Sequence, residues 1–331
     1  MKKKYKFLKV LSKQKPLKDR VKEWFIVTMG LIGFGLTMKE IVDLSKKDVN
    51  ISFLCVIITL TLCGVISYFY LLFKNREMFS KSFKWTNGYE VTVVVGDYFE
   101  TLEAYPDGVA VSGMSSTINT DKAKKDSVYY GIYKEYCKVN KKNVDAASAL
   151  EFDKEVINGK CKSVEANLNE GSKEKKCELG EISKVHFINE EDKIRYAFFI
   201  SNSQIENNRD EFYGNMQSLN SFDNLWEAFI ETNIFPSPLV MPMLGTGHSK
   251  DNSEMSSAVG IIESFFEYCY IKTEGKKGNR TVVNSIVLSI PITFITEQKI
   301  NLYDLHRYIE LKDNLLDILY VNNGKYEKII G

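Results

Sequence analysis

The sequence predicts an α/β protein, a three-layer α/β/α sandwich with a mixed sheet, preceded by a two-helix transmembrane hairpin. Two observations predict this organisation. Residues 1–85 contain two long apolar runs, whereas the following residues alternate between β-branched segments and amphipathic segments of helical period. The second part, about 245 residues, is long enough for one large domain with its own core. Alternating strands and helices are typical of a sheet covered by helices on both faces.

The apolar runs predict transmembrane helices at residues 24–44 and 51–73. The second run is the clearer one, because its 23 residues carry no charge and are long enough to cross a bilayer. The first run is apolar over fifteen residues, and its continuation adds Lys39, Glu40 and Asp43, which would lie at the membrane interface. A signal peptide is the alternative, but no small-residue cleavage site follows the first run.

The distribution of basic residues predicts that both chain ends are cytoplasmic. Residues 1–23 form a basic N-terminus with ten Lys and Arg residues. The connection 39–50 has equal numbers of basic and acidic residues, and the segment 74–84 is again basic. Because positive flanks remain in the cytoplasm, we expect a multi-pass protein whose cytoplasmic domain spans residues 86–331.

The composition argues against a nucleic-acid surface and against a metal centre. The formal net charge is +1, and because the N-terminus is strongly basic, the rest of the chain is mildly acidic. The six cysteines form no CxxC pair and match no zinc module, and the three histidines lie far apart. We therefore expect free cytoplasmic thiols, no metal ligands and no cofactor.

The cytoplasmic domain is predicted to contain strands and helices in alternation. The expected strands are residues 89–95, 108–111, 184–188, 195–201, 239–243 and 282–290. The expected helices are residues 127–137, 146–157, 221–230, 253–269 and 301–319, with N-caps at Ser127, Ser221, Ser253 and Asn301. Strands 184–188 and 195–201 are expected to form a hairpin, and the polar residues 158–180 a surface loop.

Periodicity also predicts which side chains of the last two helices enter the core. For the helix after Ser253 they are Met255, Val259, Ile262, Phe266 and Cys269. For the helix after Asn301 they are Leu302, Leu305, Ile309, Leu315 and Leu319.

The most informative segment for function is LVMPMLGTGHSK at Leu239–Lys250. Its apolar strand ends at Pro242, and Gly245, Thr246 and Gly247 follow before a helix begins. Glycines let backbone N–H groups approach a ligand, and a strand–loop–helix junction favours anions. We interpret the segment as a phosphate-binding loop, although it is neither a Walker A loop nor a GxGxxG motif. The alternative is a tight turn that requires positive φ.

Two further segments follow predicted strands. Asp97 comes directly after a buried strand, where its carboxylate can accept a hydrogen bond from an exocyclic amine such as that of adenine; a helix cap is the alternative. Ser112, Ser115 and Asn119 belong to a polar segment that is either a ribose- or phosphate-contacting loop or an ordinary surface loop. His248, beside the glycines, is interpreted as a ligand contact or a solvated turn residue rather than a catalytic base.

Taken together, these segments resemble the macro domain, a family that binds ADP-ribose and its derivatives. The resemblance covers roughly residues 86–295, and its sharpest motif is MPMLGTGH at 241–248. It implies that Asp97 contacts adenine and that residues 245–247 hold phosphate. Residues 112–115 stand where the family often has N-A-A-N.

The difference at residues 112–115 bears on activity. The sequence Ser-Gly-Met-Ser lacks the asparagine that hydrolytic members of the family use beside the distal ribose. We therefore expect a protein that binds its nucleotide and is not an enzyme, with no catalytic residues. The alternatives are a membrane-tethered ADP-ribosyl hydrolase and a passive anchored scaffold.

Two transmembrane helices followed by a macro-like domain resemble the membrane effectors of type II Thoeris antiviral systems. The resemblance implies a bacterial inner-membrane protein of anti-phage defence that binds an ADP-ribose-derived messenger, histidine-ADP-ribose, made by a partner TIR-domain protein. It further implies that the bound protein forms homo-oligomers and disrupts the lipid bilayer, which kills the infected cell (abortive infection).

Overall fold

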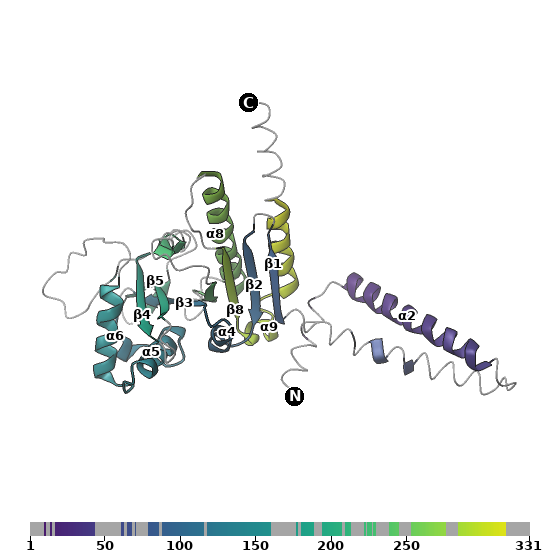
Figure 1. The fold of residues 1–331 in the computed structure, drawn as a ribbon, viewed down its shortest axis with the longest axis horizontal. Helices are drawn as coiled ribbons and strands as arrows, with labels where there is room; N and C mark the ends of the chain where they lie inside the picture. The colour runs from purple at the N-terminus through teal and green to yellow at the C-terminus, as the bar shows by residue number, and fades with distance from the viewer. Residues whose placement is uncertain are drawn as a thin grey trace, which may run out of the picture.

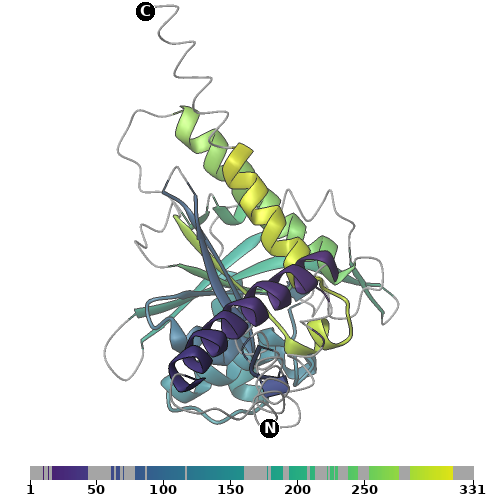
Figure 2. The same ribbon diagram turned by 90° about the vertical axis from the view of Figure 1, so that its right-hand side faces the viewer.

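The computed structural model describes most of the domain predicted at residues 86–331 and parts of the N-terminal segment. The described ranges are residues 17–43, 65–67, 79–85, 88–115, 118–159, 180–188, 194–206, 209–212, 224–226, 238–244, 253–275 and 284–315, with the single residues 10, 14, 61, 62, 70, 177, 222, 228 and 229. Within these residues, one mixed sheet lies between two groups of helices (Figures 1 and 2).

The sheet has eight strands in the described chain. They are β1 (Ser80–Lys84), β2 (Glu90–Val95), β3 (Val109–Ser115), β4 (Ile182–Ile188), β5 (Ile194–Glu206), β6 (Arg209–Phe212), β7 (Leu239–Pro242) and β8 (Ser285–Ile290). Their order is β1-β2-β8-β7-β3-β5-β4, and β6 pairs with β5. Neighbours among β2, β8, β7, β3 and β5 are parallel, whereas β1, β4 and β6 pair antiparallel. The carboxyl ends of five strands therefore meet at one edge of the sheet.

Helices cover both faces of the sheet. One face carries α4 (Tyr98–Ala104), α5 (Val128–Val139) and α6 (Ala146–Asn158), and the other carries α8 (Glu254–Gly275) and a helix over residues 302–315. The short helices η2 (Thr120–Lys122) and α9 (Ile292–Thr296) lie in connections. This arrangement confirms the predicted α/β sandwich with its mixed sheet.

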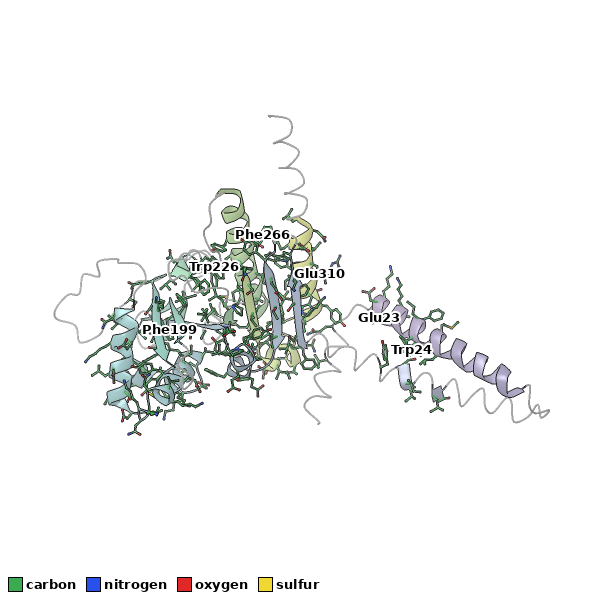
Figure 3. All side chains as sticks on the ribbon, viewed as in Figure 1. Glu23, Trp24, Phe199, Trp226, Phe266 and Glu310 are labelled. Atoms are coloured by element: carbon green, nitrogen blue, oxygen red, sulfur yellow. The ribbon has the colours of Figure 1, made fainter. Side chains whose placement is uncertain are left out.

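Each face has a core of its own, rich in aromatic rings. On the α5–α6 face, Phe152 packs edge-on against Phe199 with ring centroids 5.8 Å apart. On the α8 face, Trp226 packs against Phe265 at 5.5 Å. Figure 3 shows Phe199 and Trp226 inside the sandwich and Trp24 outside it, on the N-terminal helix. Both cores consist largely of fully buried side chains, so both helical layers are fixed to the sheet.

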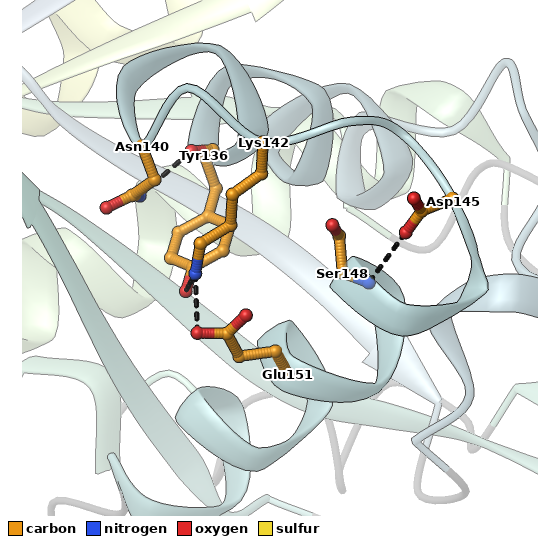
Figure 4. A network of polar contacts seen from close by, with 6 residues as sticks. All are labelled: Tyr136, Asn140, Lys142, Asp145, Ser148 and Glu151. Carbon is orange, nitrogen blue, oxygen red and sulfur yellow. Dashed lines mark hydrogen bonds and ion pairs between the residues drawn. The ribbon is translucent and has the colours of Figure 1, made fainter.

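The connection between α5 and α6 is held by polar contacts (Figure 4). Lys142 Nζ lies 2.5 Å from Glu151 Oε1 and 3.3 Å from the hydroxyl group of Tyr136. Asp145 caps α6 by accepting from the N–H of Ser148 at 2.9 Å. These contacts fix the start of α6.

Most predicted elements are present. The strands predicted at residues 89–95, 184–188, 195–201 and 239–243 are present as β2, β4, β5 and β7. β4 and β5 form the predicted antiparallel pair. The predicted N-caps Ser127, Ser253 and Asn301 each accept a hydrogen bond from a helical N–H, at 3.1, 3.1 and 3.2 Å. Ser221 and most of the loop 158–180 lie outside the described residues.

Two core predictions are wrong in detail. In α8 the predicted residues Ile262 and Phe266 are buried, but Ala258, Ile261, Phe265 and Tyr268 are buried as well. Met255 and Val259 are only half-buried and pack against the core. The buried face is therefore wider than predicted, and it includes Phe265, which packs against Trp226.

Leu315 was also assigned to the core, and 40% of its surface is exposed. The contacts of helix 302–315 with β1 and Trp85 end at Ile309 and Glu310, so the last turn passes beyond the edge strand. Leu319 and the side chain of Cys269 lie outside the description.

Other elements were not predicted. β1, β6, α4 and α9 had no counterpart in the sequence-based prediction. The strand expected at 108–111 continues to Ser115 as β3, so residues 112–115 belong to the sheet and not to a loop. β1 pairs with β2 along its whole length, so the sheet begins before the boundary predicted at residue 86.

The N-terminal segment contains one long helix, α2 (Leu17–Asp43), which covers the first predicted transmembrane helix almost to its end. Figure 1 shows this helix outside the sandwich. It exposes large apolar side chains, among them Trp24, Phe25 and Ile26. Within the described residues, no helix has both the length and the apolar character needed to cross a membrane. Most of the second predicted transmembrane helix, 51–73, lies outside these residues.

Candidate ligand-binding site

The sheet topology indicates one position where a ligand is expected to bind. β3 and β7 are parallel neighbours, but β3 continues into α5 on one face and β7 into α8 on the other. In open α/β sheets, ligands bind outside the carboxyl ends of strands at such a switch point. The candidate site therefore lies at the carboxyl ends of β3 and β7.

β3 and β7 separate toward this edge. Their register includes only two residue pairs, Val109 with Leu239 and Ala110 with Val240. Beyond them the hydroxyl group of Tyr98 lies between the strands. It is 3.0 Å from the carbonyl oxygen of Val111 and 3.1 Å from that of Val240, and it accepts from the N–H of Val111 at 3.1 Å. Tyr98 thus satisfies main-chain groups that the separation would leave unpaired.

Asp97 is the N-cap of α4, which confirms the alternative that the sequence left open. Its Oδ1 atom accepts from the N–H groups of Phe99 and Glu100, at 2.8 and 3.2 Å. The side chain is exposed, and Oδ2 makes no hydrogen bond to any residue that the structure describes. A cap through Oδ1 is compatible with acceptance from an amine through Oδ2, because each carboxylate oxygen can accept separately.

Ser112 and Ser115 lie in β3, at the candidate edge. Ser112 is buried, and its hydroxyl group donates to the carbonyl oxygen of Gly113 at 3.0 Å. Ser115 is half-buried at the end of β3, where the register with β5 shifts after Met114. Of the two serines, Ser115 is the better placed to meet a ligand.

Asn119 and Thr120 fix the end of the segment that follows β3. Asn119 Oδ1 accepts from the N–H of Lys122 at 3.2 Å and caps η2. Thr120 is fully buried, and its backbone N–H and hydroxyl group donate to Asp153 Oδ1 at 3.1 and 2.5 Å. Because that hydroxyl group has one hydrogen, the Tyr129 hydroxyl group, 2.9 Å away, must donate to Thr120 Oγ1.

In this network the carboxylate of Asp153 accepts from Thr120, and the hydroxyl group of Tyr129 in turn donates to Thr120. Burial raises the pKa of Tyr129 well above 10, so the phenol stays protonated and remains a donor. Asp153 of α6 is buried, and it accepts a hydrogen bond from the backbone N–H of Thr120, the first residue of η2. Sequence reasoning missed Asp153; the available signal was a carboxylate at the spacing of Ala149 and Val156, within the apolar stripe of its helix.

The predicted glycine loop follows β7 in the sequence. Gly245, Thr246, Gly247 and His248 are outside the described residues, so their role stays a prediction. The residues that flank them are fixed: Leu244 is buried, and its carbonyl oxygen accepts from the hydroxyl group of Ser257 in α8. The loop therefore runs from the carboxyl end of β7 to the start of α8, a junction that favours anions.

The described residues contain no group of His, Cys, Asp and Glu that could hold a metal ion. Cys137 and Cys177 are buried and form no disulfide, as predicted. The described part of the site offers a carboxylate oxygen of Asp97 and main-chain groups near the carboxyl ends of β3 and β7. Such groups can bind a polar ligand by hydrogen bonds.

The fold is an α/β/α sandwich whose mixed sheet has its candidate ligand site at the carboxyl ends of β3 and β7. The family model described as Thoeris protein ThsA, Macro domain, matches residues 91–279, more than half of the 331-residue chain. The chain therefore belongs to the Thoeris ThsA macro-domain family. This confirms the resemblance at the level of the family and places the protein in Thoeris-type anti-phage defence, with an ADP-ribose-derived ligand. No curated protein matches the chain.

Proposed function

We propose that this protein is a defence effector whose macro domain binds histidine-ADP-ribose, made by a partner TIR-domain protein, without hydrolysing it. Binding makes several copies associate in the bacterial inner membrane and disrupt it, and the infected cell dies. The family match over residues 91–279 carries the proposal, and the site geometry supports it.

Two features at the sheet edge support a dinucleotide ligand. Asp97 Oδ2 is an exposed acceptor for the adenine amine. The segment 245–248, which the sequence predicts to bind phosphate, connects β7 to α8 in the chain, and we assign the diphosphate contact to its backbone N–H groups. The Ser-Gly-Met-Ser segment at 112–115, with its buried Ser112, lacks the amide that hydrolytic macro domains use, which favours binding over hydrolysis.

The N-terminal segment supports the membrane part of the proposal. α2 exposes apolar side chains, and the residues before it are basic, as a cytoplasmic membrane flank should be. The hydroxyl group of Thr28 donates to Ser67 at 3.2 Å, so α2 contacts the second predicted transmembrane helix. Two helices are too few to enclose an aqueous pore, so damage requires several copies.

Ligand binding must then change association. Moving a population from mostly idle to mostly assembled needs a preference of about 5.5 kcal/mol for the assembled state. A ligand supplies such energy only through different affinities for the two states.

The experiment is a calorimetric titration of the detergent-solubilised full-length protein with ADP-ribose and with histidine-ADP-ribose. We expect the histidine adduct to bind more tightly and to remain intact. Gly245→Val and Gly247→Val should lose binding, because branched side chains would stand where the diphosphate approaches. Gly260→Val is the matched control, since open space surrounds the position of its Cβ on α8. Steady consumption of ligand would establish a hydrolase instead, and absence of binding a scaffold.

The toxicity test requires a truncation that respects the sheet. Deleting residues 1–85 would remove β1 and expose the edge of β2, so a chain beginning at Phe79 is the appropriate variant. It should bind ligand and no longer depolarise cells that contain an active signal source. Cell killing by this truncated chain would contradict the membrane mechanism.

A further inference from the structure

The pairing of β3 and β7 stops where β7 reaches a proline. The N–H of Val109 donates to the carbonyl oxygen of Pro238 at 2.9 Å, and the last residue pair of the register is Ala110 with Val240. Main-chain groups of every second residue in a strand face the same neighbour, so residues 238, 240 and 242 face β3. Pro242 has no N–H group, and it therefore cannot donate the next hydrogen bond to β3.

The hydroxyl group of Tyr98 lies at the end of this ladder. It is 3.0 Å from the carbonyl oxygen of Val111 and 3.1 Å from that of Val240, so its hydrogen is within reach of main-chain oxygens of both strands. It also accepts from the N–H of Val111 at 3.1 Å. A side chain thus supplies the donor that Pro242 lacks, and the strand ends satisfy these main-chain groups without approaching each other further.

The Tyr98 side chain is itself fixed by packing. Its ring is buried and meets the ring of Phe99 edge-on, with centroids 5.2 Å apart. Phe99 in turn packs so closely on α5 that a Cβ added at Gly131 would collide with its ring. The first turn of α4 is also held to β8, because the hydroxyl groups of Thr101 and Ser289 lie 3.2 Å apart. Contacts within the fold therefore set the position of the Tyr98 hydroxyl group.

Tyr98 adjoins both described parts of the candidate site. It directly follows Asp97 in the chain, so it also fixes where the exposed carboxylate stands relative to the strand ends. By the alternation along β3, the main-chain groups of Val109, Val111 and Gly113 face β7. Gly113 comes after the last pair of the described register. Its main chain therefore faces the space that opens between the two strands at the carboxyl edge.

We propose that Tyr98 is a positioning residue of the ligand site. Its hydroxyl group, together with the missing N–H of Pro242, keeps the carboxyl ends of β3 and β7 apart at the spacing that the nucleotide requires. This inference rests on the proposed function and names the residues that shape its site. Tyr98 acts through the main chain of the two strands and through Asp97, and it requires no contact of its own with the ligand.

The first test compares two tyrosines in the detergent-solubilised full-length protein. Tyr98→Phe keeps the ring and removes the hydroxyl group that sets the strand spacing, so the calorimetric dissociation constants for ADP-ribose and histidine-ADP-ribose should rise about tenfold or more. Tyr133→Phe is the matched control, because its hydroxyl group also donates to a main-chain carbonyl oxygen, that of Asp145 at 2.9 Å, between α5 and α6. The control should also lose thermal stability but bind within about twofold of wild type. Equal affinities of the two variants would overturn the inference.

Pro242→Ala separates the shape of the site from the stability of the fold. Alanine supplies an N–H group that competes with Tyr98 for the carbonyl oxygen of Val111, so the strand ends should approach each other. Affinity for both nucleotides should fall about fivefold or more, while the unfolding midpoint stays close to that of wild type. A role of Tyr98 in stability alone predicts wild-type affinity for Pro242→Ala. This variant also decides the question if Tyr98→Phe does not fold, because wild-type affinity would then contradict the inference.

Failure of the inference and failure of the proposed function give different results. If Tyr98→Phe and Pro242→Ala bind as wild type does, the inference is wrong while the proposed function stands. If wild type binds neither ADP-ribose nor its histidine adduct, the proposed function fails and the inference fails with it.

Discussion

Asp153 accepts two hydrogen bonds from Thr120, one from its backbone N–H and one from its hydroxyl group. The two residues come from α6 and η2, and together they fix the chain that follows β3 at the candidate site. A buried carboxylate that receives two donors from one residue is a positional restraint, because removing either donor leaves a charge poorly satisfied.

Thr120→Val should lower the free energy of unfolding by about 1.5–3 kcal/mol, the usual worth of a hydrogen bond to a charged group. The variant keeps the shape of the side chain but removes the donor to Asp153 and the acceptor for Tyr129. Urea unfolding of the chain beginning at Phe79 measures the change. Thr293→Val, at an exposed position, is the control, and an equal loss in both variants would show that the network is not responsible.

Asp97→Asn separates the helix cap from the ligand contact. Asparagine retains Oδ1 as a cap acceptor but places an amide NH₂ group where Oδ2 would accept from adenine. We expect thermal stability close to wild type and a dissociation constant for ADP-ribose that rises about tenfold to hundredfold. Asp97→Ala should reduce both stability and binding. Unchanged affinity in Asp97→Asn would remove Asp97 from the site.

Gly159→Ala should destabilise the domain by about 1–3 kcal/mol through overpacking. The end of α6 approaches β4 so closely that an added Cβ would collide with the carbonyl oxygen of Lys184, a main-chain atom that cannot move aside. The N–H of Lys184 donates to the carbonyl oxygen of Gly159 at 2.6 Å, which holds the two segments together. Gly260→Ala, with open space around its Cβ, should be neutral or stabilising. Equal unfolding midpoints for the two variants would contradict this packing.

His306 should make stability depend on pH below neutrality. Burial, and secondarily the charge of Lys81, lowers the pKa of His306 from 6.5 to about 3. The unfolded chain therefore binds one more proton than the folded chain between pH 6.5 and 3, so His306 reduces stability as pH falls through that window and has no effect above it. The slope from this residue is at most about 1.4 kcal/mol per pH unit.

Urea unfolding at pH 7.5 and pH 5 measures this dependence. His306→Phe, beside the ring of Phe83, should be less sensitive to acid than wild type. The comparison between the two proteins removes the contribution of carboxyl groups that titrate in both. An identical pH dependence would show that His306 is not the group responsible.

Local pattern was sufficient for many elements. The run at Glu90–Val95 is β-branched and continuous, and it forms a strand buried between neighbours. Ser127 precedes an amphipathic run and caps α5. These features depend on residues close in sequence, whose spacing repeats with the period of a strand or a helix.

Features that depend on distant contacts were not predictable in this way. The hydroxyl group of Tyr98 lies between β3 and β7, and its partner Val240 in β7 comes 142 residues later in the chain. Nothing beside Tyr98 in the sequence indicates that role. Phe265 of α8, which was not predicted to enter the core, is buried against Trp226. Gln14 Oε1 accepts from the N–H of Leu302, almost at the opposite end of the chain, and no local pattern relates the two residues.

The sequence by itself determined the alternation of strands and helices, the segment P-M-L-G-T-G beside a strand end, and the family to which the chain belongs. Only the tertiary structure decided that α5 and α8 cover opposite faces, that β3 and β7 separate there, and that Asp97 divides its two oxygens between a cap and solvent. The reason is physical: periodicity records which residues face a core, whereas the choice of neighbouring strand, helical layer and hydrogen-bond partner is made by packing between segments far apart in the chain.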